Sequence, residues 1–155
     1  MENSNQLSAR FGEVMLNGTW IANTNFKHVL DDVNWQQAVK KTGSLNTIAA
    51  LTFHINYYIT GIIEVLKGGE LTIRDKYSFD MPEIKNEEDW NRLKESLLTN
   101  SAAFAQLVAG LTDEQLAADF SNPKYGSYRR NIEAMIEHAY YHLGQLSLLK
   151  KMNSQ

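Results

Sequence analysis

The chain has 155 residues, of which 43% are hydrophobic and 21% are charged, and its formal net charge is -3. These values are typical of one globular domain covering residues 1–155, and a weakly acidic chain without a basic run is a poor candidate for nucleic-acid binding. Cysteine is absent, which excludes disulfides, thiolate metal ligands and cysteine nucleophiles.

The first half of the chain contains three segments with helical character. Apolar residues recur at helical spacing over residues 5–18, and the less regular stretch that follows predicts a short helix around residues 26–33. Ser44 is the expected N-cap of a second long helix, residues 45–67, which stops at Gly68.

The second half begins with a loop and ends with the longest helical pattern. Residues 70–85 contain Pro82 and predict a loop, after which Asn86 caps a helix whose first turn is acidic. Thr112 opens a capping-box pattern that predicts a short additional helix to about residue 118. Ser127 is the expected start of the last long helix, which runs to about residue 152.

Taken together, these segments predict an all-α protein, a four-helix bundle. The connections between the long helices are long, and long connections permit neighbouring helices to run parallel. Residues 42–63 carry no charge but include His54 and Asn56, so we expect a buried bundle helix and no membrane span. The polar N-terminal segment, with Glu2, is unlike a secretory signal, and we expect a cytoplasmic protein.

Three of the four histidines stand out by their positions. In the segment IEHAYYHLGQ, His138 and His142 are four residues apart, so they differ by only about 40° around a helix and lie on one face. His54 lies midway along the second long helix, and ligands from facing helices can converge in a bundle core. Three imidazoles would leave a coordination position open on a divalent metal, which is the pattern of a catalytic site.

Other interpretations of these histidines are weaker or stay open. The zinc-protease motif requires a glutamate where this helix has Ala139, and a di-iron bundle requires Glu-x-x-His where it has Met135. Ordinary core histidines that bind no metal remain an alternative. His28 lies in irregular surroundings and is expected at the surface.

Two further residues are candidates for supporting or substrate-binding roles. Tyr58 lies one turn after His54 and could orient a ligand or donate a proton. Gln145 lies two turns after His138 and could hydrogen-bond a metal-bound water or link two helices. Both residues could equally be ordinary packing at the edge of the core.

The segments LTFHINYYI and HAYYHLGQL, together with the long connection, resemble the DinB/YfiT-like metalloenzyme family over nearly the whole chain. The resemblance implies that His54, His138 and His142 form a metal triad in an up-down-down-up four-helix bundle. It also implies a homodimer and, as in several relatives, a reaction that uses a low-molecular-weight thiol.

Two functional hypotheses follow, besides a purely structural role. The first is a divalent-metal enzyme, a transferase or hydrolase, and specifically an S-transferase that joins a low-molecular-weight thiol to a small electrophile. The alternative is a non-enzymatic bundle, with a stress-related role, that binds a metal or a small ligand. Zinc or nickel is the expected metal, with iron, manganese or copper as alternatives. We expect a small-molecule substrate and neither a nucleic-acid nor a membrane partner.

Overall fold

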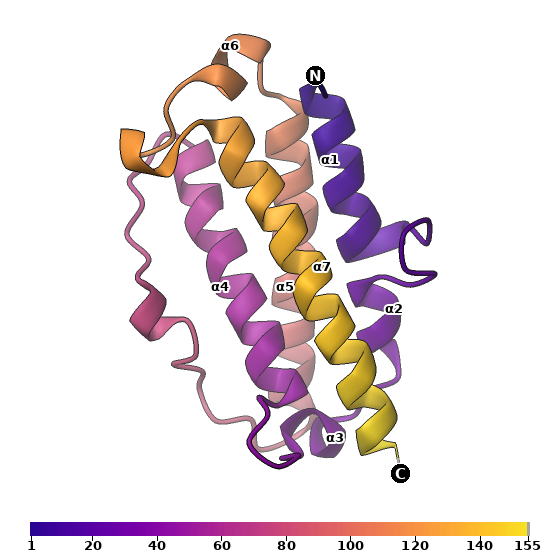
Figure 1. Cartoon of the computed structure of the whole chain (residues 1–155). Helices are drawn as coiled ribbons and strands as arrows, with labels where there is room; N and C mark the ends of the chain where they lie inside the picture. The colour runs from indigo at the N-terminus through magenta and orange to yellow at the C-terminus, as the bar shows by residue number, and fades with distance from the viewer. Residues whose placement is uncertain (155) are drawn as a thin grey trace.

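A computed structural model of the chain describes residues 1–154 and shows a bundle of four long helical segments (Figure 1). They are α1 (Ser4–Gly12), continued by the π-helix η1 (Glu13–Asn17), then α4 (Ile48–Leu66), α5 (Glu87–Ala109) and α7 (Tyr128–Asn153). Shorter helices lie in the connections: α2 (Phe26–Asp31), α3 (Trp35–Val39), η2 (Asp75–Tyr77), α6 (Asp113–Ala117) and η3 (Pro123–Tyr125). The predicted all-α bundle is confirmed.

The helix directions follow from the long connections. In Figure 1, α1 and α7 run from the top of the bundle to the bottom, whereas α4 and α5 run from the bottom to the top. This is the up-down-down-up order that the resemblance implied. The closest pairings are between α4 and α5, α1 and α5, and α4 and α7. The parallel pair α4 and α5 is possible because residues 67–86 return along the length of the bundle.

Side-chain caps define where several helices begin. Asn86, Thr112 and Ser127 each accept a hydrogen bond from a backbone N–H in the first turn of the following helix, as predicted. Ser44 was wrongly predicted as a cap: Thr47 caps α4. The reason is a turn around Gly43, which has a φ of +55° and delays the start of the helix.

The structure corrects two further details of the predicted helices. The first helix does not run as one α-helix over residues 5–18, because its last turn, Glu13–Asn17, widens into a π-helix. The short helix α3 was not predicted, although Asn34 and Gln37 form a capping box at its start. The π-helix η1 packs against α5 and α7, and α3 packs against α4 and α5.

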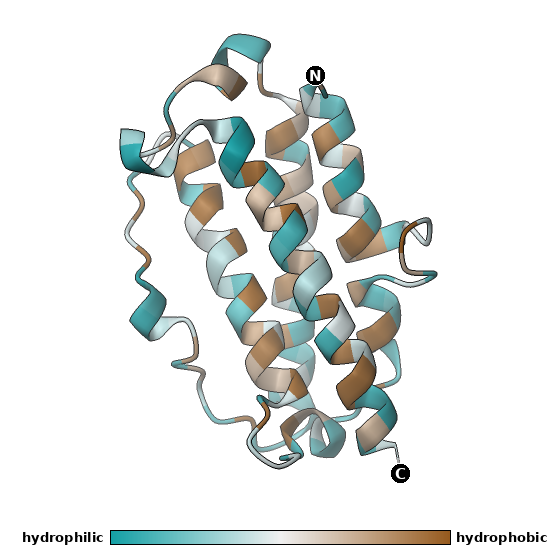
Figure 2. Ribbon diagram, viewed as in Figure 1, coloured by the Kyte–Doolittle hydropathy of each residue, from teal (hydrophilic) through white to brown (hydrophobic). Residues whose placement is uncertain are grey.

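The core consists of the inward faces of the four long helices. Apolar and polar segments alternate along each of them in Figure 2, which is the pattern of a helix with one buried face. Within residues 1–154, α4 is long and apolar enough to cross a membrane by length and composition, and 61% of its apolar window is buried inside the bundle. The core helix of a bundle meets the same criterion.

Candidate metal centre

The candidate site lies midway along the seam between α4 and α7. These two helices run in opposite directions and contact each other, which brings the centre of α4 opposite the centre of α7 (Figure 1). His54 comes from α4, and His138 and His142 project from consecutive turns of α7. The structure therefore brings together the three histidines that sequence reasoning singled out.

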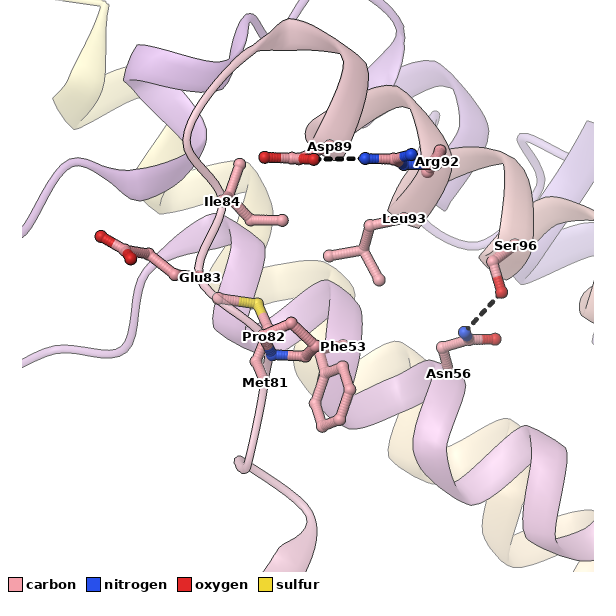
Figure 3. A pocket seen from close by; sticks show the side chains of 10 residues that line it. All are labelled: Phe53, Asn56, Met81, Pro82, Glu83, Ile84, Asp89, Arg92, Leu93 and Ser96. Atoms are coloured by element: carbon pink, nitrogen blue, oxygen red, sulfur yellow. Dashed lines mark hydrogen bonds and ion pairs between the residues drawn. The ribbon is translucent and has the colours of Figure 1, made fainter.

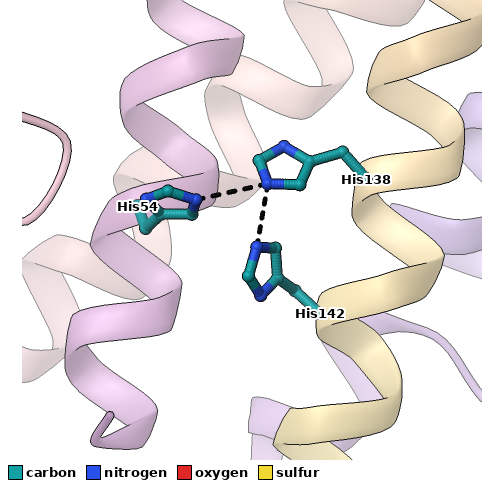
Figure 4. A group of neighbouring side chains, drawn as sticks. All are labelled: His54, His138 and His142. Atoms are coloured by element: carbon teal, nitrogen blue, oxygen red, sulfur yellow. Dashed lines mark hydrogen bonds between the residues drawn. The ribbon is translucent and has the colours of Figure 1, made fainter. Parts of the chain in front are cut away.

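The three imidazole rings point toward one another (Figure 4). The Nε2 atom of His138 lies 3.2 Å from Nε2 of His54 and 2.8 Å from Nε2 of His142. The potential ligand atoms of all three residues lie within 4.8 Å of one another. Two imidazole nitrogens bound to one tetrahedral zinc ion are about 3.4 Å apart, given a Zn–N bond of about 2.0–2.1 Å. The spacing of the nitrogens is therefore close to that of a ligand set.

Burial keeps the histidines neutral. His54 and His142 are only 8% and 6% exposed. Burial, with the neighbouring histidines His142 and His54, lowers the pKa of His138 to about 4. Burial also lowers the pKa of His54 and of His142. Neutral imidazole is the form that binds a metal, so at neutral pH the site needs no proton release before binding.

Gln145 determines the tautomer of His142. The Nδ1 atom of His142 lies 2.6 Å from Oε1 of Gln145. An amide oxygen only accepts hydrogen bonds, so Nδ1 carries the proton and Nε2 presents its lone pair to the other two rings. This is the arrangement in which an outer residue orients a metal-binding histidine.

The tautomers test whether these residues fit a metal. Because Nε2 of His142 has a lone pair, a proton on Nε2 of His138 could be donated to it. The same proton cannot also form a hydrogen bond with Nε2 of His54, so the contact between His138 and His54 lacks a bridging proton. A cation among the three nitrogens satisfies all of their lone pairs at once. The donor set therefore fits a divalent metal with three imidazole ligands.

Aromatic side chains surround the three histidines. The ring of Phe79 stacks on His54, with centroids 4.2 Å apart and an interplanar angle of 15°. The ring of Tyr58 meets His54 and His138 edge to face, at 5.0 and 5.3 Å. The ring of Tyr141 meets His142 in the same way at 5.0 Å. The immediate surroundings of the triad are therefore largely aromatic and uncharged.

Tyr58 is held in place by the connection between α4 and α5. Its hydroxyl donates a 2.9 Å hydrogen bond to Oδ1 of Asp75. Burial and this carboxylate raise the pKa of Tyr58, so the phenol stays protonated at neutral pH. The hydroxyl is therefore engaged by Asp75, while the ring of Tyr58 packs against the histidines.

The other nitrogen of His54, Nδ1, faces the connection between α4 and α5. This atom is buried without a hydrogen-bond partner among the described residues. The main chain of Ser78 lies near His54 and partly offsets the effect of burial on its pKa. It does not form a hydrogen bond with Nδ1. Sequence reasoning missed Asp75, Ser78 and Phe79, since no local pattern indicates where a loop will fold back. His28 is exposed on α2, as expected.

The comparisons with known proteins support one family. The model of the DinB superfamily matches residues 22–146, which include the three histidines, Tyr58 and Gln145. No curated protein and no solved structure gives a significant match to the chain. The matched region covers most of the chain, so the chain belongs to the DinB superfamily.

Proposed function

We propose that His54, His138 and His142 hold one divalent metal ion and that the protein is a metal-dependent enzyme that transfers a low-molecular-weight thiol to a small electrophile. The observation that carries the proposal is the convergence of three neutral imidazole nitrogens on one point between two helices. Three protein ligands leave a coordination position free, which is typical of catalytic sites.

The residues of the chain have separate roles in this proposal. When bound, the metal supplies Lewis acidity, which favours the thiolate form of a thiol at neutral pH. The three histidines supply neutral ligands, and Gln145 keeps the lone pair of His142 directed inward. Tyr58 fixes the ring positions of His54 and His138, and the aromatic surroundings exclude water.

The ligand set favours zinc or nickel. Imidazole is a borderline donor that suits zinc, nickel, copper and iron, whereas manganese prefers oxygen ligands. Asp75 is the carboxylate that faces this region, and Tyr58 engages one of its oxygens. We therefore place manganese after zinc, nickel and iron.

The first test is metal content by mass spectrometry of protein purified without an affinity tag. We expect about one equivalent in the wild type and a loss of most of it in His138→Ala. His28→Ala is the matched control, because it removes an exposed histidine from α2 and leaves the seam intact. A wild type that takes up none of zinc, nickel, iron, copper and manganese overturns the proposal.

Turnover separates the enzyme from the non-enzymatic alternative. The metal-loaded protein is incubated with a panel of low-molecular-weight thiols and small electrophiles, and consumption of the thiol is followed. We expect consumption that depends on the metal and disappears in His138→Ala. Stoichiometric metal without any turnover would favour the non-enzymatic bundle that binds a metal or small ligand.

The expectations on partners and location stay predictions. A homodimer is part of our proposal, and exposed apolar residues on the outer face of α7, such as Leu148 and Met152, support it. Light scattering of the wild type and of Leu148→Glu tests it. Cytoplasmic location and independence from nucleic acids and membranes are likewise proposed.

A further inference from the structure

The connection between α4 and α5, residues 67–86, is called the strap here. It runs along the outside of the bundle from the top of α4 to the bottom of α5, and its only regular structure is the single turn η2 (Figure 1). Such a segment has few buried apolar contacts of its own. It can therefore move at a lower free-energy cost than the helices that it connects.

The strap covers the candidate metal centre on one side. Phe79 lies flat on the ring of His54, and Ser78, beside it, is only 3% exposed. Phe79 itself is 44% exposed, so its other side faces solvent. One aromatic ring thus lies between solvent and His54 at this point. A ligand that approaches from this side must displace Phe79.

Adjacent tyrosines of α4 hold the strap in this position. The hydroxyl of Tyr57 donates to the carbonyl oxygen of Arg74 at 3.0 Å, and the N–H of Arg74 donates to the same hydroxyl at 2.9 Å. The hydroxyl of Tyr58 donates to the carboxylate of Asp75 at 2.9 Å. All three hydrogen bonds are exposed to solvent and so are easily exchanged for hydrogen bonds to water.

A glycine allows the strap to approach α4 closely. A Cβ atom at Gly61 would lie 2.5 Å from Cδ1 of Ile73 and 2.7 Å from two further carbons of that side chain. Ile73 therefore occupies the space that any other residue at position 61 would need. Together, Gly61 and the tyrosine hydroxyls position residues 73–79 from the helix that carries His54.

The next part of the strap is less closely packed. Met81, Glu83 and Ile84 line a pocket of about 340 Å³ against α4 and α5 and a second of about 700 Å³ toward α3. Figure 3 shows the first pocket, in which Met81 lies beside Phe53 and Ile84 faces Leu93, while the carboxylate of Glu83 points away from both. Cavities on both sides leave room for this segment to shift while the helices keep their packing.

We propose that strap residues 73–79 form a lid over the metal centre, latched by the hydroxyls of Tyr57 and Tyr58, and that ligands reach the metal when the lid lifts. The proposal rests on the proposed function in that a metal at the three histidines is what the lid covers. Lifting breaks three exposed hydrogen bonds, unstacks Phe79 from His54, exposes Ser78 and withdraws Ile73 from Gly61. The apolar core between the four long helices stays intact.

The first test measures how fast a chelator removes zinc from the loaded protein. The variants are Tyr57→Phe, which removes the two hydrogen bonds to Arg74, and Phe79→Ala, which removes the cover. Loss of one hydrogen bond shifts the equilibrium between closed and open lid by a factor on the order of five. We therefore expect the chelator to remove zinc at least about five times faster from Tyr57→Phe than from the wild type. Tyr77→Phe is the control, because Tyr77 is an exposed strap tyrosine whose ring contacts Lys76.

The second test needs no metal. Diethyl pyrocarbonate modifies accessible neutral imidazoles, and peptide mass spectrometry follows the modification of His54 in metal-free protein. We expect faster modification of His54 in Tyr57→Phe and Phe79→Ala than in the wild type and Tyr77→Phe. Thermal unfolding of each variant verifies that the bundle is folded.

The two tests distinguish failure of the lid from failure of the proposed function. If the protein binds no divalent metal but His54 becomes more reactive in the two variants, the metal proposal is overturned, and residues 73–79 remain a lid over the histidines alone. If zinc binds and both the chelator rate and the reactivity of His54 equal those of the wild type in both variants, the lid is overturned.

Discussion

The seam between α1 and α5 and the seam between α4 and α7 are built from opposite kinds of side chain. Between α1 and α5, Phe11 and Phe104 are fully buried, with ring centroids 4.2 Å apart. Between α4 and α7, by contrast, three imidazoles contact one another. Buried polar groups stabilise a fold less than apolar groups of the same size. This difference is the one expected if the first pair of rings stabilises the fold and the three histidines hold the proposed metal.

The largest expected effect comes from removing a ring at the α1–α5 seam. Phe104→Ala deletes a fully buried aromatic side chain and leaves a cavity against Phe11. We expect the free energy of unfolding to fall by about 3–5 kcal/mol. Urea unfolding measures it. His142→Leu in the metal-free protein should change the same quantity by less than about 1 kcal/mol. Equal losses in both variants would contradict the division between the two seams.

The second prediction concerns stabilisation by metal at the α4–α7 seam. A ligand that binds only the folded protein raises the free energy of unfolding by about 2.7 kcal/mol at a concentration of 100 times its Kd. We expect thermal unfolding of the wild type to shift upward with zinc, and this shift to vanish in His54→Ala. Phe104→Ala should retain it, since the mutation lies at the other seam. A shift that persists in His54→Ala would place the zinc elsewhere.

The third prediction concerns pH in the metal-free protein. The pKa of His138 is about 4 in the folded protein, against 6.5 for an unperturbed histidine. Between these values the unfolded chain binds more protons than the folded one, so stability is present above pH 6.5 and is lost as the pH falls toward 4. Discounted for partial solvent exposure, the lowered pKa of His138 alone reduces the free energy of unfolding by about 2 kcal/mol over this fall in pH. The lowered pKa values of His54 and His142 act in the same direction.

Chemical unfolding at pH 7 and pH 5 measures this loss. His138→Gln removes the titrating group and should flatten the dependence on pH, and Phe104→Ala should leave its slope unchanged. A wild type with equal stability at both values would show that the three imidazoles are not desolvated as the structure describes.

The helices could be predicted from local signals, and the site only in part. The caps at Asn86, Thr112 and Ser127 act on backbone groups within one turn, so the sequence next to them is enough. The spacing of His138 and His142 likewise predicted a shared face. Ser44 was wrongly predicted because a turn at Gly43 competes with the helix start.

The cover of the site could not be predicted from the sequence. Phe79 lies 25 residues after His54 in a loop without periodicity, and its stacking depends on where Tyr57 and Gly61 hold the strap. These are contacts between distant segments. Gln145 lies between the two cases: its proximity to His142 follows from helical spacing, but the 2.6 Å contact with Nδ1 depends on side-chain rotamers.

The smallest expected effect is that of Gln145→Ala on metal affinity. Loss of the amide oxygen frees His142 to adopt the other tautomer, in which a proton occupies the nitrogen that faces the metal. Removing such an outer partner weakens metal binding by about 10-fold or more, or about 1.4 kcal/mol. Competition with a chelator of known affinity measures it. Gln145→Glu should recover most of the affinity, since a carboxylate also accepts from Nδ1–H, and Gln106→Ala on the exposed face of α5 should bind as the wild type. If Gln145→Ala and Gln145→Glu both bind zinc like the wild type, the orientation of His142 comes from its packing against Tyr141 and His138 and not from this hydrogen bond.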